Sequence, residues 1–333
     1  MSEAIIARGG RKGGEYSTSK LVTEIFLSNA IWFVPSNAVN NTFSVRIFGG
    51  GGSGAILNYP IDRMVYDRLG GGGGWMNNGD IVLTPGESIF INIGSGGKAI
   101  SSYYFQDNEL KQYFRGVSGG TSFFGNYLSA NGGRGPSATL GSSYCTGGSG
   151  GSGGSGESSF LGPAGYQFGG GGGASSGSGG NGGPWGGGGG GSYGSSIGCG
   201  GQYGGNGGTR DILAEDGTNT IGWTNVGQEL NGEYIVGYGK AGIGSNAGGG
   251  GFGGNGGYNW GGGGGYGADG GNNVGGGGGY GKGGYGGSNH GGGGSYGRGG
   301  SNNNIPLFGG GGSGNENSIN GADGICIVQY YSI

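Results

Sequence analysis

The chain has few of the residues on which catalysis and metal binding depend. Its 333 residues include one histidine, His290, and three isolated cysteines, Cys145, Cys199 and Cys326. A structural zinc site needs four nitrogen or sulfur ligands at short paired spacings, and a Ser-His-Asp triad would have to use His290 in a segment with almost no apolar support. We therefore expect that the protein is not an enzyme and has no cofactor and no metal site. We also expect His290 to lie in a solvated loop. Whether any cysteines pair stays open.

Charge and long apolar runs are also scarce. Fifteen Lys and Arg face eighteen Asp and Glu, a net charge of −3, so the chain offers no basic footprint for nucleic acid. No run approaches the roughly 20 apolar residues of a membrane span, and the opening Met1–Arg8 lacks the apolar stretch of a signal peptide. We expect a protein made in a reducing cytoplasm that binds no nucleic acid and inserts into no membrane.

Glycine, by contrast, makes up 108 residues, while only 31% of the chain is hydrophobic. Most of the length therefore cannot form a conventional apolar core. Collagen is excluded because its triple helix needs an unbroken Gly-X-Y repeat rich in proline, whereas this chain has seven prolines and tandem runs such as Gly186–Gly191. Residues 1–130 hold only 23 of the glycines, so the composition divides the chain near residue 130.

The first part has the pattern of short β-strands. Thr42–Phe48 and Ser88–Ile93 alternate between apolar and polar residues, which places Phe43, Val45 and Ile47, and likewise Ile89, Ile91 and Ile93, on one face. Further strands are expected at Ile31–Val34, Asp80–Thr84 and Thr121–Phe124, with Leu21–Leu27 as a strand or a short helix. Gly324–Tyr331 predicts a last strand of high propensity, and only the sheets of the first part offer it an apolar partner.

These strands predict an all-β fold with three regions. Residues 31–130 and 321–333 would form a small, jelly-roll-like β-sandwich. Residues 1–30 would be an attachment arm or a first strand. Residues 131–320 would be a large glycine-rich insertion that carries variable loops.

The insertion has two alternative fates. Glycine-rich sequence is by default a flexible coil. The alternative is a polyglycine-II bundle, in which glycine helices with three residues per turn bond side by side because no Cβ separates them. This bundle needs glycine at every third position, as at Gly275, Gly278, Gly281, Gly284 and Gly287. Such runs favour the bundle, and their frame shifts mark turns between short helices.

Five sequence blocks follow one another in a distinctive order. They are Trp32–Pro35, Phe43–Phe48 with the glycines after it, Leu83–Gly97, Gly120–Phe123 and Gly321–Tyr331. This order resembles the glycine-rich domain of phage tail-fibre and receptor-binding proteins, the tail-tip adhesins. A similar layout occurs in the glycine-rich ectodomain of the anaplastic lymphoma kinase receptor.

The resemblance implies a virion tail component, made in the host cytoplasm and exposed outside the cell after release. It would bind a bacterial surface receptor, either a protein or a polysaccharide, together with other tail-fibre or baseplate proteins. Homotrimeric assembly is an option, because trimers are common among tail fibres. Two alternatives remain: a structural tail or baseplate decoration that binds no receptor, and a glycine-tyrosine low-complexity protein that binds RNA.

Recognition by a glycine scaffold must come from its interruptions, which are rich in Tyr, Trp, Asn, Ser and Asp, as paratope loops are. They are 101–115, 137–146, 157–168, 209–238, 258–260, 288–290, 302–308 and 315–320. For each aromatic residue the alternative is a cap on a glycine helix or a spacer between helices. The candidates for receptor contact are Trp185, Trp223, Trp260, Tyr280, Tyr285 and His290.

Overall fold

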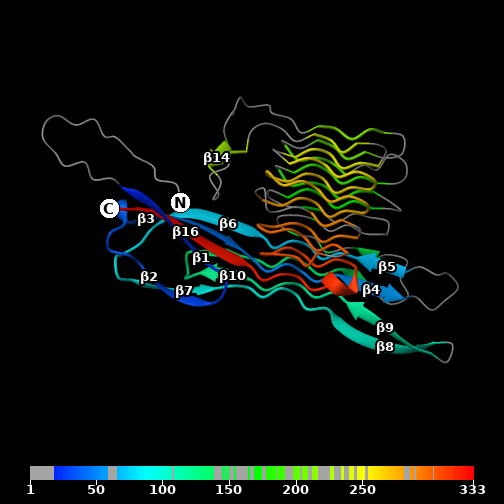
Figure 1. Ribbon diagram of the computed structural model, residues 1–333, viewed down its shortest axis with the longest axis horizontal. Coiled ribbons are helices and arrows are strands. Elements are labelled where there is room, and N and C mark those ends of the chain that lie inside the picture. The colour runs from blue at the N-terminus through cyan, green and yellow to red at the C-terminus, as the bar shows by residue number, and fades with distance from the viewer. Residues whose placement is uncertain are drawn as a thin grey trace, which may run out of the picture.

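The protein is mostly β-structure in a computed structural model. The structure describes residues 19–58, 66–106, 109–138, 145–146, 148, 150, 154, 164–165, 169–174, 178–184, 186–191, 198–202, 205–208, 212–216, 226–228, 234–235, 240–243, 246–251, 254–280, 286–288, 290–302 and 304–333. Within these residues the helices are two short 3₁₀ turns, η1 (Val39–Asn41) and η2 (Glu316–Ser318). The expected all-β class is confirmed, with three four-stranded antiparallel sheets that dominate the fold (Figure 1).

The first sheet contains the C-terminal strand at its centre. Its order is β1 (Lys20–Phe26), β16 (Ile325–Ser332), β3 (Thr42–Phe48) and β6 (Met76–Val82). β16 pairs antiparallel with β1 on one side and with β3 on the other. The prediction that the last strand packs into the first part of the chain is therefore confirmed, and the segment that could have been strand or helix is the strand β1.

The second sheet shares an apolar core with the first. Its order is β11 (Leu128–Ala130), β10 (Ser122–Phe124), β7 (Ser88–Asn92) and β2 (Ala30–Phe33). One cluster of buried side chains joins Phe43, Val45 and Val328 of the first sheet to Ile91 and Phe124 of the second. The two alternating patterns of the sequence are confirmed, since every apolar residue that they place inward is at most 9% exposed.

Two cysteines are free thiols in different surroundings. Cys326 is fully buried in this core, and burial raises the pKa of its thiol to about 12, whereas Cys199 is exposed. Because the thiolate is the reactive form, we expect iodoacetamide at pH 8 to modify Cys199 in the folded protein and Cys326 only after unfolding. Peptide mass mapping measures both sites, and guanidinium should equalise their rates. Equal labelling in buffer would contradict the buried position.

A third sheet was not expected from the sequence. Its order is β5 (Tyr66–Leu69), β4 (Ala55–Asn58), β9 (Glu109–Arg115) and β8 (Ile100–Gln106). The interruption at 101–115, predicted as a recognition loop, belongs instead to the hairpin of β8 and β9, which pair from Ile100–Arg115 to Gln106–Glu109. The error has a physical reason: Tyr and Phe favour strands as much as they favour contact loops. Two small pairs complete the β-structure: β12 (Ser137–Ala138) with β13 (Cys145–Thr146), and β14 (Val226–Gln228) with β15 (Tyr234–Ile235).

Glycine segments connect the third sheet to the first two. Residues 49–54, 70–75, 93–99 and 116–121 run between β3 and β4, β5 and β6, β7 and β8, and β9 and β10. They bond to one another through their backbones, as from Gly52 N–H to Gly72 C=O at 2.9 Å and from Gly50 N–H to Gly120 C=O at 3.0 Å. Packed glycine segments thus begin well before residue 131, where the composition had placed their start. The composition missed them because blocks of four or five glycines contribute little to the average glycine content of residues 1–130.

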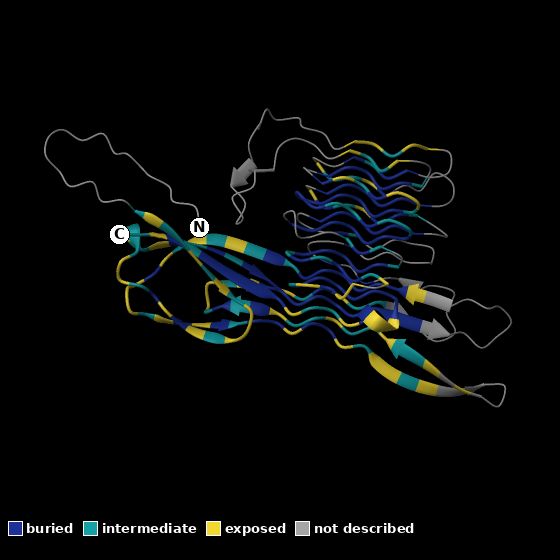
Figure 2. Cartoon of the chain, in the orientation of Figure 1, coloured by how far each residue is buried: buried dark blue, intermediate teal, exposed yellow. Residues whose placement is uncertain are grey.

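The later glycine segments stack on these into an array (Figure 1), whose interior is buried (Figure 2). Its hydrogen bonds repeat every three residues. The N–H groups of Gly262, Gly263 and Gly264 donate to the C=O groups of three different segments, at Gly271, Gly171 and Gly249. Gly261, three residues before Gly264, donates to Asn246, three residues before Gly249. Each segment is therefore bonded to neighbours on several sides.

Close approach explains why these positions are glycine. A Cβ built on Gly263 would overlap the carbonyl oxygen of Gly187, and one on Gly277 would overlap that of Gly170. Both glycines lie outside the left-handed φ region, which the described glycines enter only at Gly86, Gly125, Gly267 and Gly309. The array therefore requires glycine at these positions mainly because a side chain would not fit, and less because glycine has a flexible backbone.

A second core fastens the array to the first sheet. Phe48, Met76, Ile325 and Ile327 pack with Tyr266 and Tyr280 of the array, and Tyr296 and Phe308 lie against them. The rings of Tyr266 and Tyr280 are stacked, 5.1 Å apart and 9° from parallel. Tyr280, predicted as a receptor contact, is only 8% exposed. The prediction of a receptor contact is therefore wrong for Tyr280. The apolar end of the first sheet buries the ring, which has the spacer role that was the alternative for each aromatic residue.

Candidate functional site

Three glycine segments of the array share one sequence pattern. Each has five small residues between a turn residue and a tyrosine: Trp260 to Tyr266, Val274 to Tyr280 and His290 to Tyr296. The three tyrosines belong to the second core or pack against it. The turn residues lie at the other end of each segment. This repeat is a signal in the sequence that the search for glycine at every third position missed.

The turns before the first two of these segments have the same backbone form. Asn259 and Trp260 have φ of 53° and 54°, and Asn273 and Val274 have φ of 53° and 60°. One hydrogen bond spans each of these two turns, from Gly257 N–H to Gly262 C=O and from Gly271 N–H to Gly276 C=O. Two consecutive residues at positive φ are the mark of a type I′ turn, where Asn-Gly is the favoured pair.

The turns stack into a column. The carbonyl oxygens of Asn246, Trp260, Val274 and His290 accept hydrogen bonds from Gly261, Gly275, Gly291 and Gly314, with N···O distances of 2.9–3.3 Å. We call the turns centred on these four residues the turn column. Its side chains also bond across turns, since Asn259 Nδ2 donates to Asn273 Oδ1 at 2.8 Å.

The turn column holds side chains where glycine would be less strained. Asn246, Trp260, Val274 and His290 all have φ between 54° and 62°. A non-glycine residue rarely adopts this region, and for a β-branched or bulky one it is a strained conformation. The chain has 108 glycines, yet Trp, Val and His occupy these positions, where glycine would relieve about 1–3 kcal/mol of backbone strain each. Strained positions of this kind cluster at binding sites.

Buried polar atoms without partners gather in the same column. Across the described residues, four buried side-chain atoms lack a hydrogen bond, and three of them are Asn246 Oδ1, Trp260 Nε1 and His290 Nδ1. An unsatisfied buried donor or acceptor costs about 1–3 kcal/mol. Such a concentration at one place makes the column a costly part of the fold, which requires an explanation other than stability.

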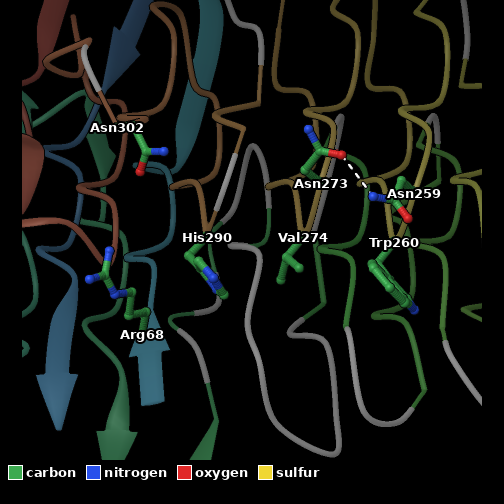
Figure 3. Close-up of a pocket in the computed structure, with 7 residues that line it drawn as sticks. All are labelled: Arg68, Asn259, Trp260, Asn273, Val274, His290 and Asn302. Carbon is green, nitrogen blue, oxygen red and sulfur yellow. Dashed lines mark hydrogen bonds between the residues drawn. The ribbon is translucent and has the colours of Figure 1, made fainter. Parts of the chain in front are cut away.

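A hollow of about 350 Å³ lies along the turn column. Figure 3 shows its lining, with His290, Val274 and Trp260 in a row and Arg68 and Asn302 at one end. Arg68 comes from β5 and donates from Nη1 to Asn315 Oδ1. The hollow therefore joins the turn column to the edge of the third sheet.

Burial of the imidazole and, to a smaller extent, the nearby Arg68 cation together lower the pKa of His290 from 6.5 to about 4. His290 is therefore neutral at physiological pH, with one ring nitrogen as donor and one as acceptor. The expectation of a solvated loop histidine is wrong, because the stacked neighbouring turns cover the ring.

The structure brings two predicted contact residues, Trp260 and His290, into one column. Trp185, Trp223 and Tyr285 lie outside the described residues. Two further lining residues, Asn259 and Asn302, lie in the predicted interruptions 258–260 and 302–308, whereas sequence reasoning missed Arg68 and Asn273. The Asn that precedes both Trp260 and Val274 was a usable signal for Asn273, whereas nothing in the sequence connects Arg68 to the array.

No protein-family model matches the chain, and no curated protein sequence matches it. Over the described ranges, no helix has the length and apolar character to cross a membrane. In the same part of the chain, no three or more His, Cys, Asp or Glu side chains gather as ligands for a metal ion.

Proposed function

We propose that this protein is a phage tail adhesin that binds a bacterial surface receptor through the turn column. The observation that carries the proposal is the set of strained side chains with unpaired polar atoms, Asn246, Trp260 and His290, aligned in one column. Tyr, Trp, His and Asn on rigid turns are suited to recognition, because they offer contact area and hydrogen bonds at little entropic cost.

The proposed scaffold is a β-sandwich that carries a polyglycine-II bundle. The shared core of the first two sheets supports the sandwich. The hydrogen bonds that repeat every three residues toward three neighbours support the bundle, since such helices have three residues per turn. A bundle bonded on several sides is stiff, so the turns at its ends are held in a fixed arrangement before any ligand binds.

The positions of the two ends suit this function. β1 and the C-terminus lie at one end of the molecule, and the array and third sheet lie toward the other (Figure 1). The second core fixes the tyrosine end of each glycine segment to the first sheet, so the turn column points toward the third sheet. We propose that the chain attaches to the virion tail through the sandwich and presents the column to the host.

The test is adsorption of the full-length protein to a panel of bacterial strains, measured by flow cytometry of labelled protein. The matched variants are Trp260→Gly with His290→Gly, because glycine keeps the positive φ of both turns. We expect the double variant to bind the responsive strain at least tenfold more weakly. The control is Val82→Ser, at a position that is 72% exposed on β6, and it should bind like the wild type. Failure of the wild type to bind any strain would contradict the proposal.

One observation favours the alternative of a structural tail or baseplate protein. Ile31, Phe33 and Phe90 are 64%, 66% and 47% exposed on the outer face of the second sheet, where Ile31 lies opposite Phe90. An apolar face of this kind is typical of contact with another protein. A structural protein would bind to virions and not to cells, so the adsorption experiment separates the two functions.

A further inference from the structure

We propose that the hollow along the turn column is a subsite for an acidic saccharide unit, a sugar ring that carries a carboxylate. This inference rests on the proposed adhesin function, because it names the receptor chemistry that the same column would recognise. It follows from three properties of the hollow: its size, its hydrogen-bonding groups and its charge.

The size fits one small unit. The hollow has a volume of about 350 Å³, at the lower end of the roughly 300–1,000 Å³ of small-molecule pockets. It is lined by side chains from two consecutive turns, from His290 and from β5, so it is a concave site on a rigid wall. A single sugar ring fills such a volume, whereas a protein receptor would need a broad, flatter surface.

The hydrogen-bonding groups match hydroxyls. Three lining residues are asparagines, and each amide both donates and accepts, as a hydroxyl does. The bond from Asn259 Nδ2 to Asn273 Oδ1 leaves Asn259 Oδ1 and Asn273 Nδ2 for other partners. Trp260 adds an aromatic ring and His290 adds an imidazole, whereas Trp260 Nε1 and His290 Nδ1 are themselves buried. Val274 is the one aliphatic residue in the lining that the structure describes.

The charge selects an anion. Arg68 lies at one end of the hollow (Figure 3), and none of the described lining residues is acidic. Arg68 uses Nη1 to bind Asn315, which leaves Nη2 and Nε for a ligand. A guanidinium binds a carboxylate through two parallel hydrogen bonds. One cation at the His290 and Asn302 end of the hollow, with amides along the rest of it, thus fits a sugar carboxylate better than a polyphosphate, which would require more positive charge.

The experiment is binding of purified full-length protein to glucuronic acid, galacturonic acid, N-acetylneuraminic acid and 3-deoxy-octulosonic acid. Saturation-transfer NMR and fluorescence titration measure the affinity, and the methyl ester of each sugar is the uncharged control. We expect at least one acid to bind about tenfold more tightly than its ester, which corresponds to about 1.4 kcal/mol. No binding of any acid at 50 mM, or equal binding of acid and ester, would overturn the subsite.

Variants place the binding in the hollow. Arg68→Gln should weaken binding of the acid about tenfold and leave the ester unaffected, and Arg68→Lys should keep part of the preference because the charge remains. Trp260→Gly removes the ring that lines the hollow and keeps the positive φ of the turn, so it should weaken acid and ester alike. Val82→Ser is the unaffected control, and thermal melting verifies that each variant is folded. Unchanged affinity in both Arg68→Gln and Trp260→Gly would overturn the assignment.

The two proposals fail in different ways. Wild-type protein that adsorbs to cells but binds no acidic sugar overturns the subsite and leaves the adhesin standing. The same conclusion follows if Arg68→Gln adsorbs to cells as strongly as wild type. Wild-type protein that adsorbs to no cell, while binding an acidic sugar in the hollow, overturns the adhesin and supports the subsite.

Discussion

Replacing Gly263 by alanine should destabilise the protein by about 3 kcal/mol or more, because the new methyl group would overlap the backbone of a neighbouring segment. The obstructing atom is the carbonyl oxygen of Gly187, which the array holds in place through its own hydrogen bonds. Neither segment has a side chain that could rotate away, so both backbones would have to move apart. Urea unfolding followed by circular dichroism measures the loss.

The matched control is Gly79→Ala. A Cβ at Gly79 on β6 would meet only the side chain of Leu128, at 3.6 and 3.9 Å, which is ordinary van der Waals contact. Alanine there also reduces the entropy of the unfolded chain, so the free energy of unfolding should change by less than about 1 kcal/mol. Equal effects of the two substitutions would contradict the packed array, because a flexible glycine coil tolerates alanine everywhere.

The second large effect is a loss of stability in mild acid that depends on His290. Its pKa is about 4 in the folded protein against 6.5 for an unperturbed histidine. Between these values the unfolded chain binds a proton that the folded chain does not. The stabilisation is therefore fully present above pH 6.5 and is lost as the pH falls toward 4. Since the ring is not fully buried, we expect this loss to be about 2–3 kcal/mol.

The comparison is with His290→Gln, which keeps a polar side chain at the same backbone position and has no titration in this range. The free energy of unfolding of wild type minus that of the variant should decrease from pH 7 to pH 4. His290 is the only histidine in the chain, so its ring protons in an NMR titration report its pKa directly. A midpoint near 6.5 would contradict the buried position in the turn column.

Much of the strand structure could be predicted from the sequence. The alternation in Thr42–Phe48 and Ser88–Ile93 corresponds to β3 and β7, and the apolar C-terminal strand is β16 at the centre of a sheet. These predictions succeed because both signals can be read directly from the sequence. The first is the alternation of apolar and polar residues with a period of two, and the second is the lack of any other apolar partner for the last strand. The hairpin of β8 and β9 was missed because its side chains suit a loop as well as a strand.

The candidate site was only partly predictable. Trp260 and His290 stand out as polar or aromatic interruptions of glycine, but their alignment needs stacked turns that lie 14 and 16 residues apart along the chain. Tyr280 has the same local sequence features and is buried, because its segment ends against Phe48 of the first sheet. An aromatic residue flanked by glycine can lie either at the end of a segment that packs in the second core or at the end that forms a turn, and the local sequence does not distinguish the two.

The sequence by itself determined that the chain is all-β and that most of it cannot form an apolar core, since both follow from composition and period. Only the tertiary structure decided which glycines face a neighbouring backbone and which aromatic residues are buried. It also decided that Arg68 of β5 lies beside His290 of the array. The physical reason is that glycine carries no side chain to encode a partner, so the pairing of segments is fixed by the sheets and turns that hold their ends.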